Sequence, residues 1–227
     1  MGTTAIMIDG GFYQKRAQAL WGDKSAKDRA YELIRYCNKH IEIVDGKEAR
    51  SLYRIFYYDC PPVSKKVYHP LKKATIDFSK TGLFIWMNEF HNELRSKRKV
   101  ALRFGRIQDD FANYVLKPDV VKKLCNGVLA ATELQEKDFT LTIKQKGVDM
   151  RVGLDIASVC FKRQVNQIVL ISGDSDFVPA AKLARREGID FLLDPMHAGI
   201  NDELFEHIDG LWSPKLYPGS NTCEGGI

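Results

Sequence analysis

Four short apolar runs divide the chain, and each is followed within three residues by an aspartate. They cover residues 5–8, 52–58, 168–171 and 191–193. Each run is continuous rather than alternating, which is typical of a parallel strand covered on both faces. Helical patterns lie between them, at residues 29–43, 150–162 and 177–186. Strands that alternate with helices over short links predict an α/β fold with a parallel sheet.

A long segment from about residue 61 to residue 146 interrupts this alternation. Its pattern predicts helices over 82–97 and 118–134 and strands over 100–104 and 139–144. Gly/Ser linkers, repeats and low-complexity tracts are absent from the sequence, so a second folding unit is not required. We therefore expect one domain over residues 1–219, with an inserted α+β elaboration at about 61–146 and a flexible tail over 220–227.

Acidic residues stand where the predicted strands end, which is where ligands bind in an open parallel sheet. Asp9 follows the first run, and Asp174 and Asp176 follow the run at 168–171. Asp149 falls in the first turn of the helix predicted near residue 150. Asp155 lies six residues further on and points to another helical face, so it is the weaker candidate ligand.

Three or four carboxylates converge at neutral pH only where a cation offsets their repulsion. Oxygen ligands select hard ions, so the expected metal is Mg²⁺ or Mn²⁺, which would activate water for attack on a phosphodiester. Gly10, Gly11 and Gly173 would let a phosphate approach the backbone closely. The alternative is that these acids are helix N-caps, and Asp176 is the strongest such candidate.

The combination of these motifs resembles the NYN domain family, and more narrowly its bacterial LabA-like branch. The residues that carry the resemblance are Ile8–Phe12, Lys146–Asp149 with Asp155, and Ser172–Phe177. The resemblance implies a PIN-like three-layer α/β/α sandwich and a Mg²⁺- or Mn²⁺-dependent ribonuclease that leaves 5′-phosphate and 3′-hydroxyl ends. The implied catalytic and metal-binding residues are Asp9, Asp149, Asp174 and Asp176, with possible support from Asp59, Asp155, Ser172 and Ser175. Many family members carry an Asn shortly after the first Asp, whereas this chain has Gly10-Gly11-Phe12 there.

Positive charge is concentrated in one part of the chain. Residues 60–108 hold eleven Lys and Arg against three Asp and Glu, whereas the whole chain has a formal charge of +5. Phosphate contacts supply affinity for nucleic acids, so we expect RNA, single-stranded, as the partner. The candidate RNA-binding residues are Arg95, Lys97, Arg98, Lys99, Arg103, Lys144 and Lys146. Tyr68, Phe84, Trp86 and Phe104 are candidates for stacking on bases, although a solvated helix end and core packing explain these residues equally well.

Composition and motif content exclude several other classes. The mean hydropathy is −0.27, and no apolar run approaches membrane-spanning length, so we expect a cytoplasmic protein. The five cysteines are scattered and form no zinc motif. A haloacid-dehalogenase-like phosphatase would need an Asp at position 11, where Gly stands, and dinucleotide-binding and P-loop motifs are absent. The remaining rival is a non-catalytic RNA-binding or protein-interaction module on the same scaffold, and a homodimer fits either function.

Overall fold

A six-stranded sheet forms the centre of the protein, and all of its strand pairs are parallel. The computed structural model describes residues 2–42 and 49–216, without the side chains of residues 109–111. The strands follow the order β10-β9-β8-β1-β2-β5. Their bounds are β1 Thr3–Asp9, β2 Ser51–Asp59, β5 Val100–Phe104, β8 Gln167–Ile171, β9 Asp190–Asp194 and β10 Gly210–Leu211. The predicted parallel sheet is thus confirmed.

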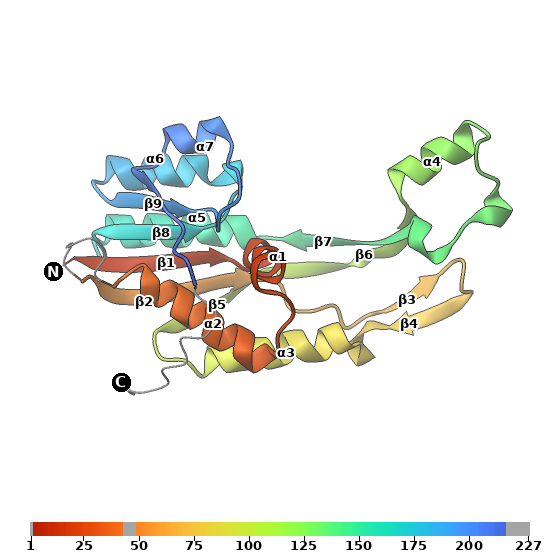
Figure 1. Ribbon diagram of the computed structural model, residues 1–227, viewed down its shortest axis with the longest axis horizontal. Coiled ribbons are helices and arrows are strands. Elements are labelled where there is room, and N and C mark those ends of the chain that lie inside the picture. Colours follow the sequence, from red (N-terminus) through yellow and green to blue (C-terminus); the bar gives the residue numbers. More distant parts are fainter. Residues whose placement is uncertain (1, 43–48, 217–227) are drawn as a thin grey trace.

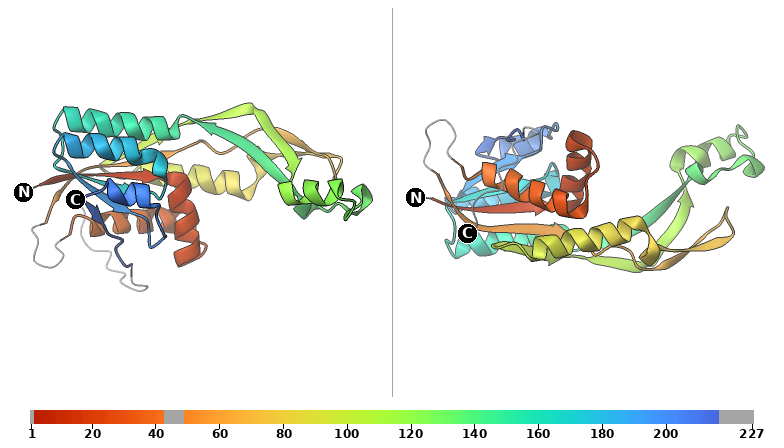
Figure 2. Two further views of the ribbon diagram at one scale, coloured as in Figure 1. Left: turned by 90° about the horizontal axis from the view of Figure 1, so that it is seen from above. Right: turned by 60° about the horizontal axis from the view of Figure 1, so that its bottom comes forward.

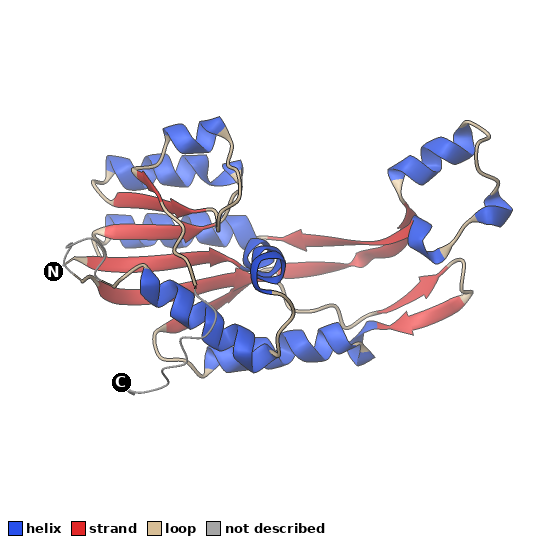
Figure 3. Ribbon diagram, in the orientation of Figure 1, coloured by secondary structure: helices blue, strands red, loops and turns tan. Residues whose placement is uncertain are grey.

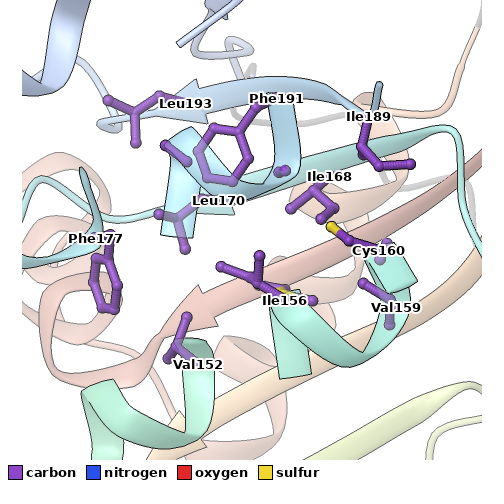
Figure 4. Close-up of a cluster of buried hydrophobic side chains, with 14 of the residues drawn as sticks. Val152, Ile156, Val159, Cys160, Ile168, Leu170, Phe177, Ile189, Phe191 and Leu193 are labelled. Carbon is purple, nitrogen blue, oxygen red and sulfur yellow. The ribbon is translucent and has the colours of Figure 1, made fainter. Parts of the chain in front are cut away.

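Helices cover both faces of this sheet (Figure 1). One face packs against α5 (Val148–Phe161), α6 (Val178–Arg186) and α7 (Asp202–Glu206). The other packs against α1 (Gly10–Trp21), α2 (Ala26–Lys39) and α3 (Gly82–Arg95). Figure 4 shows the first of these cores, where side chains of α5 meet side chains of β8 and β9. The expected three-layer α/β/α sandwich is confirmed.

Each continuous apolar run became a buried strand because both of its faces meet a helical layer. In β1, for example, Met7 joins the core under α5 and Ile8 joins the core under α1. Helix α1 was not predicted, because its apolar face consists of little more than Gly10, Tyr13 and Ala17. Its start is fixed by Asp9, whose side chain accepts a hydrogen bond from the Phe12 N–H.

A long projection leaves the sandwich on the side where the central strands end (Figures 1 and 2). We call it the arm, and it comprises residues 61–81 and 105–147. It contains an antiparallel hairpin, β3 (Lys66–His69) with β4 (Ala74–Asp77), and an antiparallel ribbon, β6 (Arg106–Leu116) with β7 (Phe139–Lys146). Helix α4 (Pro118–Cys125) and 3₁₀ turns at Phe78–Lys80, Ala131–Glu133 and Glu136–Asp138 complete it. Figure 3 shows that the ribbon consists of strand until it reaches the tip.

The segment 61–146 is therefore not one continuous elaboration. Strand β5 pairs with β2 at the edge of the central sheet, and α3 packs in the core beneath it. The sequence pattern located both elements correctly but could not show which sheet the strand joins. The helix expected over 118–134 ends at Cys125, because Asn126 caps it and Gly127 adopts a positive φ of 67°.

Two expectations fall at the limits of the described chain. The tail at 220–227 and the last residue of the helix predicted over 29–43 lie outside the described residues. Among the helices that the structure does describe, none is long and apolar enough to cross a membrane.

Candidate active site

The ends of β8, β1 and β2 lie side by side, and a cavity of about 330 Å³ opens beside them. Asp9 and Asp149 both line this cavity, although they are far apart in the sequence. Strand β1 delivers Asp9, and the ribbon β6–β7 returns the chain to the sheet just before Asp149 in the first turn of α5. The full lining is Asp9, Gly11, Phe12, Lys15, Tyr58, Asp59, Gln145, Gly147, Val148 and Asp149.

Asp9 is half-buried, whereas Asp149, Asp174 and Asp176 are exposed. Its Oδ1 accepts the Phe12 N–H at 3.1 Å, and its Oδ2 accepts the Ser172 hydroxyl at 3.3 Å. Burial raises the pKa of Asp9 above its ordinary value, and the charges of Asp149 and Asp174 raise it further, while the two hydrogen bonds oppose this rise. The ionised form therefore gains from any cation that enters the cavity.

Asp149 lines the cavity, and Asp174 lies near enough for its charge to act on Asp149. Burial raises the pKa of Asp149, and the negative charges of Asp174 and Asp176 add to this effect. Asp174, rather than Asp176, is the N-cap of the 3₁₀ turn Ser175–Phe177, and its Oδ1 accepts the Asp176 N–H at 3.0 Å. The N-cap expectation for Asp176 is thus corrected, because the helical segment begins two residues earlier than the sequence pattern indicated.

The carboxylates of Asp9, Asp149, Asp174 and Asp176 form an open group, which we call the acidic rim, rather than a closed coordination shell. Within residues 2–42 and 49–216, no three Asp, Glu, His or Cys side chains stand close enough to hold a metal ion together. The donors are nevertheless all hard oxygens, and Mg²⁺ typically uses one or two carboxylates and completes its shell with waters and substrate phosphates. An open rim of hard oxygen donors fits such an ion.

Ser172 connects the two sides of the rim. Its side chain is completely buried, its hydroxyl donates to Asp9, and its Oγ accepts the Asp174 N–H at 3.3 Å. This places one hydroxyl between the ends of β1 and β8. Ser175 is the first residue of the following 3₁₀ turn and is half-buried.

Two further aspartates end central strands but have different environments. Asp59, at the end of β2, lines the cavity and is buried, with its Oδ2 3.1 Å from His91 Nε2. Its Oδ1 accepts the Cys60 N–H at 2.7 Å. Asp194, at the end of β9, is buried against His40 at 2.8 Å and does not line the cavity. His91 is a residue that sequence reasoning missed, because nothing in the pattern links α3 to the end of β2.

Asp155 lies away from the cavity. Its Oδ2 accepts the Tyr58 hydroxyl at 3.0 Å and the Arg103 Nε–H at 2.9 Å. These contacts tie α5 to β2 and β5 in the core layer. Arg103, a candidate for RNA contact, is thus engaged by a carboxylate of the protein itself.

Comparison with protein-family models gives a match to the NYN domain over residues 65–206. This match spans more than half of the chain and contains Asp149, Asp174 and Asp176. The chain belongs to the NYN domain family. NYN domains are PIN-like nucleases, so the family supports a ribonuclease-type function in general terms. Asp9 precedes the matched range, but the pairing of β1 with β8 brings it to the cavity that Asp149 also lines. A search of curated proteins gives no match.

The predicted RNA-binding cations of this NYN domain fall at two separated places. Lys144 and Lys146 lie at the end of β7, on either side of Gln145, which lines the cavity, but they do not line it themselves. Arg95, Lys97, Arg98 and Lys99 lie where α3 leads into the start of β5. Because β5 runs parallel to β2, the start of β5 lies at the end of the sheet where the strands begin, whereas the cavity lies at the end where they finish. Tertiary contacts also engage three of them: Arg95 with Asn92, Lys97 with Glu93 and Tyr31, and Lys99 with Leu52.

The aromatic candidates divide in the same way. Trp86 stacks on Phe90 at 5.2 Å and donates its indole N–H to the Lys24 carbonyl, so it packs between α3 and the loop before α2. Phe104 packs against His91, and Phe84 is half-buried. Tyr68 is 56% exposed on the hairpin of the arm and remains available to a ligand.

Two cavity residues of the NYN domain escaped the sequence analysis. Lys15 lines the cavity from α1 and is its one cation among the described lining residues. A helix beginning at Gly10 would have placed Lys15 one turn from Gly11, but that helix was not recognised. Gln145 supplies an amide to the cavity from β7. Gln145 is the one side-chain amide among the described residues that line the cavity.

Gly10 has a different role from the one expected. A Cβ at this position would lie 2.6 Å from the Tyr58 carbonyl and 2.8 Å from the Tyr57 ring. The missing side chain thus allows α1 to approach β2, rather than allowing a phosphate to approach the backbone. Gly147 meets a different demand, because its φ of 77° turns the chain from β7 into α5 and so positions Asp149.

Proposed function

We propose that this NYN domain is a metal-dependent ribonuclease that hydrolyses RNA phosphodiesters. The observation that carries the proposal is that Asp9 and Asp149 face one cavity, with Asp174 near enough to raise the pKa of both. The family match supports nuclease chemistry in general. On the motifs at Lys146–Asp149 and Ser172–Phe177, we further place the chain in the bacterial LabA-like branch.

Asp9, Asp149 and Asp174 are the residues that would hold Mg²⁺ or Mn²⁺, with Asp176 as a further direct or water-mediated ligand. When bound, the ion would supply Lewis-acid stabilisation of the scissile phosphate and lower the pKa of water. Ser172 fixes the orientation of Asp9 through its hydrogen bond. Lys15 would neutralise a phosphate oxygen in the cavity, and Gln145 would orient the attacking water or the substrate.

We propose single-stranded RNA as the substrate. It would bind at the acidic rim, where cleavage would leave 5′-phosphate and 3′-hydroxyl ends. The cytoplasm is the proposed compartment, because Cys37, Cys60 and Cys160 are buried free thiols, which suit a reducing environment.

A homodimer through α5 is also proposed. Met150, Leu154 and Phe161 are 71%, 63% and 62% exposed on one face of this helix. Two antiparallel copies of α5 would set Met150 of one against Phe161 of the other about a two-fold axis, with Leu154 near the centre. Such a pairing is self-complementary, as an isologous interface must be.

Cleavage of a labelled single-stranded RNA with Mg²⁺, with Mn²⁺ and with EDTA tests the proposed activity. Asp174→Asn runs beside the wild type, and Asp202→Asn, which removes an exposed acid from α7, is the matched control. We expect metal-stimulated cleavage by the wild type and the control, and none by Asp174→Asn. Unchanged cleavage by Asp174→Asn contradicts the site, whereas RNA binding in EDTA without any cleavage favours a binding module.

A further inference from the structure

The arm is built as a rigid extension rather than as a loop. His69 of the hairpin packs against Tyr114 at 4.3 Å and Phe139 at 5.3 Å, which belong to the two strands of the ribbon. Lys72, in the turn of the hairpin, pairs with Glu136 near the far end of the ribbon at 2.7 Å. Val67, Ala112 and Val120 are buried within this small core. The hairpin and the ribbon are therefore packed together as one unit.

The base of the arm forms one wall of the cavity. Gln145 and Gly147 lie at the end of β7 and line the cavity together with Asp9 and Asp149. A polymer that follows the arm toward the sandwich therefore arrives at the acidic rim. The ribbon strand β6 has 11 residues, which extends for about 35 Å at roughly 3.3 Å per residue.

The net positive charge of the protein resides on the arm. Its residues, 61–81 and 105–147, contain 12 Lys and Arg against 7 Asp and Glu, and the rest of the chain is balanced at 22 of each sign. Several of its carboxylates are engaged within the arm. Asp77, Glu133 and Asp138 each accept a backbone N–H. Glu136 pairs with the ammonium group of Lys72.

Two cations at the base of the arm oppose each other directly. Arg106 of β6 and Lys146 of β7 are cross-strand partners, and both are exposed. Lys144 lies two residues further along the same face and is also exposed. Like charges directly opposite each other in an antiparallel pair destabilise the pair. Such an arrangement is relieved when an anion binds over the pair, and the phosphodiester backbone of an RNA is such an anion.

We infer that the arm is a docking surface for the phosphate backbone of single-stranded RNA, which it guides into the cavity. This inference rests on the proposed function, because the arm would bind the part of the RNA substrate that lies outside the cavity. The exposed face of the ribbon offers Asn113, Thr140 and Thr142 beside its cations, so it contacts backbone without reading bases. Tyr68 and Lys66 share the solvent face of β3 and extend the surface.

Binding of fluorescein-labelled oligouridylates of 6 and 24 nucleotides, measured by anisotropy in EDTA, tests the inference. The variant Lys122→Glu/Lys123→Glu changes the tip, about 35 Å from the cavity. A 6-mer bound at the cavity does not reach the tip unless it is fully extended along the arm. We expect its affinity for the 24-mer to fall about tenfold at 150 mM salt, and the salt slope to fall by about one to two. Binding of the 6-mer stays as in the wild type. The matched control, Lys27→Glu/Lys182→Glu, changes two exposed lysines of α2 and α6 and leaves both affinities unchanged.

A second variant separates binding from folding. Arg106→Glu places a carboxylate opposite Lys146, so we expect the melting temperature to stay the same or rise while 24-mer affinity falls. Equal losses in the arm and control variants, or no loss in either arm variant, overturn the inference. So does a wild type that binds neither oligonucleotide, which would leave a protein as the partner of this surface. Metal-dependent cleavage of the 6-mer by the tip variant shows whether the proposed function holds, independently of the arm.

Discussion

Ser172 and Asp9 are 163 residues apart in the sequence, and the Ser172 hydroxyl donates a 3.3 Å hydrogen bond to Asp9 Oδ2. This contact exists because β8 and β1 are neighbours in the sheet, with Ile8 paired to Ile171. The same Ser172 Oγ accepts the Asp174 N–H. One buried hydroxyl therefore sets the relative positions of two carboxylates that we propose as metal ligands.

Replacing Ser172 by Ala tests this positioning role. We expect kcat to fall by about ten- to a hundredfold, as for other groups that orient a metal ligand, while KM for RNA changes little. The lost hydrogen bond also lets the pKa of Asp9 rise further, so the acid limb of the pH–rate profile moves to higher pH. Steady-state kinetics across pH measure both effects. Ser158→Ala on α5 is the control, and an equal fall in the control contradicts the role of Ser172.

Asp9→Asn is expected to abolish activity and to stabilise the fold in EDTA. Loss of a ligand worth several kcal/mol lowers the rate by more than about 100-fold. Asn keeps the N-cap hydrogen bond to Phe12. Because the folded pKa of Asp9 is raised above 3.8, the ionised carboxylate costs stability. That cost is absent below about pH 3.8 and is complete above the folded pKa.

Thermal unfolding at two pH values checks this sign. At pH 7 we expect Asp9→Asn to melt about 2–4 °C higher than the wild type, the shift that about 1 kcal/mol produces in a domain of this size. At pH 3.5 the difference disappears. A variant that melts lower at pH 7 would show that Asp9 contributes to the fold through contacts beyond those seen.

Asp174 and Asp176 are expected to differ in importance. Asp174 raises the pKa of both Asp9 and Asp149, whereas Asp176 acts on Asp149 alone. We therefore expect Asp174→Asn to reduce metal-dependent cleavage by more than about 100-fold and Asp176→Asn by about tenfold. Titration of Mn²⁺ into each variant measures the apparent metal affinity. The reverse order of effects would make Asp176 the direct ligand.

Gly10→Ala is expected to destabilise the protein by about 1–3 kcal/mol. The added Cβ would lie 2.6 Å from the Tyr58 carbonyl, so α1 must move away from β2. Gly153→Ala, in the interior of α5, is the matched control, because nothing lies within 4 Å of its added Cβ. That control should gain about 0.5–1 kcal/mol. Urea unfolding of both variants gives the two values, and similar stability of the two contradicts the packing argument.

Leu154→Glu tests the proposed dimer. A charge at the centre of the apolar face of α5 would disrupt pairing of two copies, so light scattering should report a monomer where the wild type is a dimer. The melting temperature should hold, since Leu154 is 63% exposed. Lys162→Glu, just beyond the helix, is the control. A monomeric wild type at micromolar concentration rules out this interface.

The local pattern of the sequence predicted the buried strands β1, β2, β8 and β9 and the aspartates that follow them. Continuous runs such as Ile168–Ile171 are decided locally, because only a doubly covered parallel strand requires apolar residues on both faces. Asp9 and Asp174 were placed at the same end of the sheet because parallel strands end together, and Asp149 was placed in the first turn of the helix predicted near residue 150. The prediction that these three bind a metal remains to be tested.

Only the tertiary structure decided which polar residues join those acids. Lys15, Gln145 and His91 come from elements whose packing leaves no local signal, whereas Asp155 is turned toward Arg103 and Tyr58. In sequence, the basic residues at 95–99 look like an ordinary helix end. They lie far from the cavity because they precede β5, which runs parallel to β2 toward the cavity. The strand order and the direction of the arm depend on contacts between residues far apart in the chain, and a local pattern does not encode them.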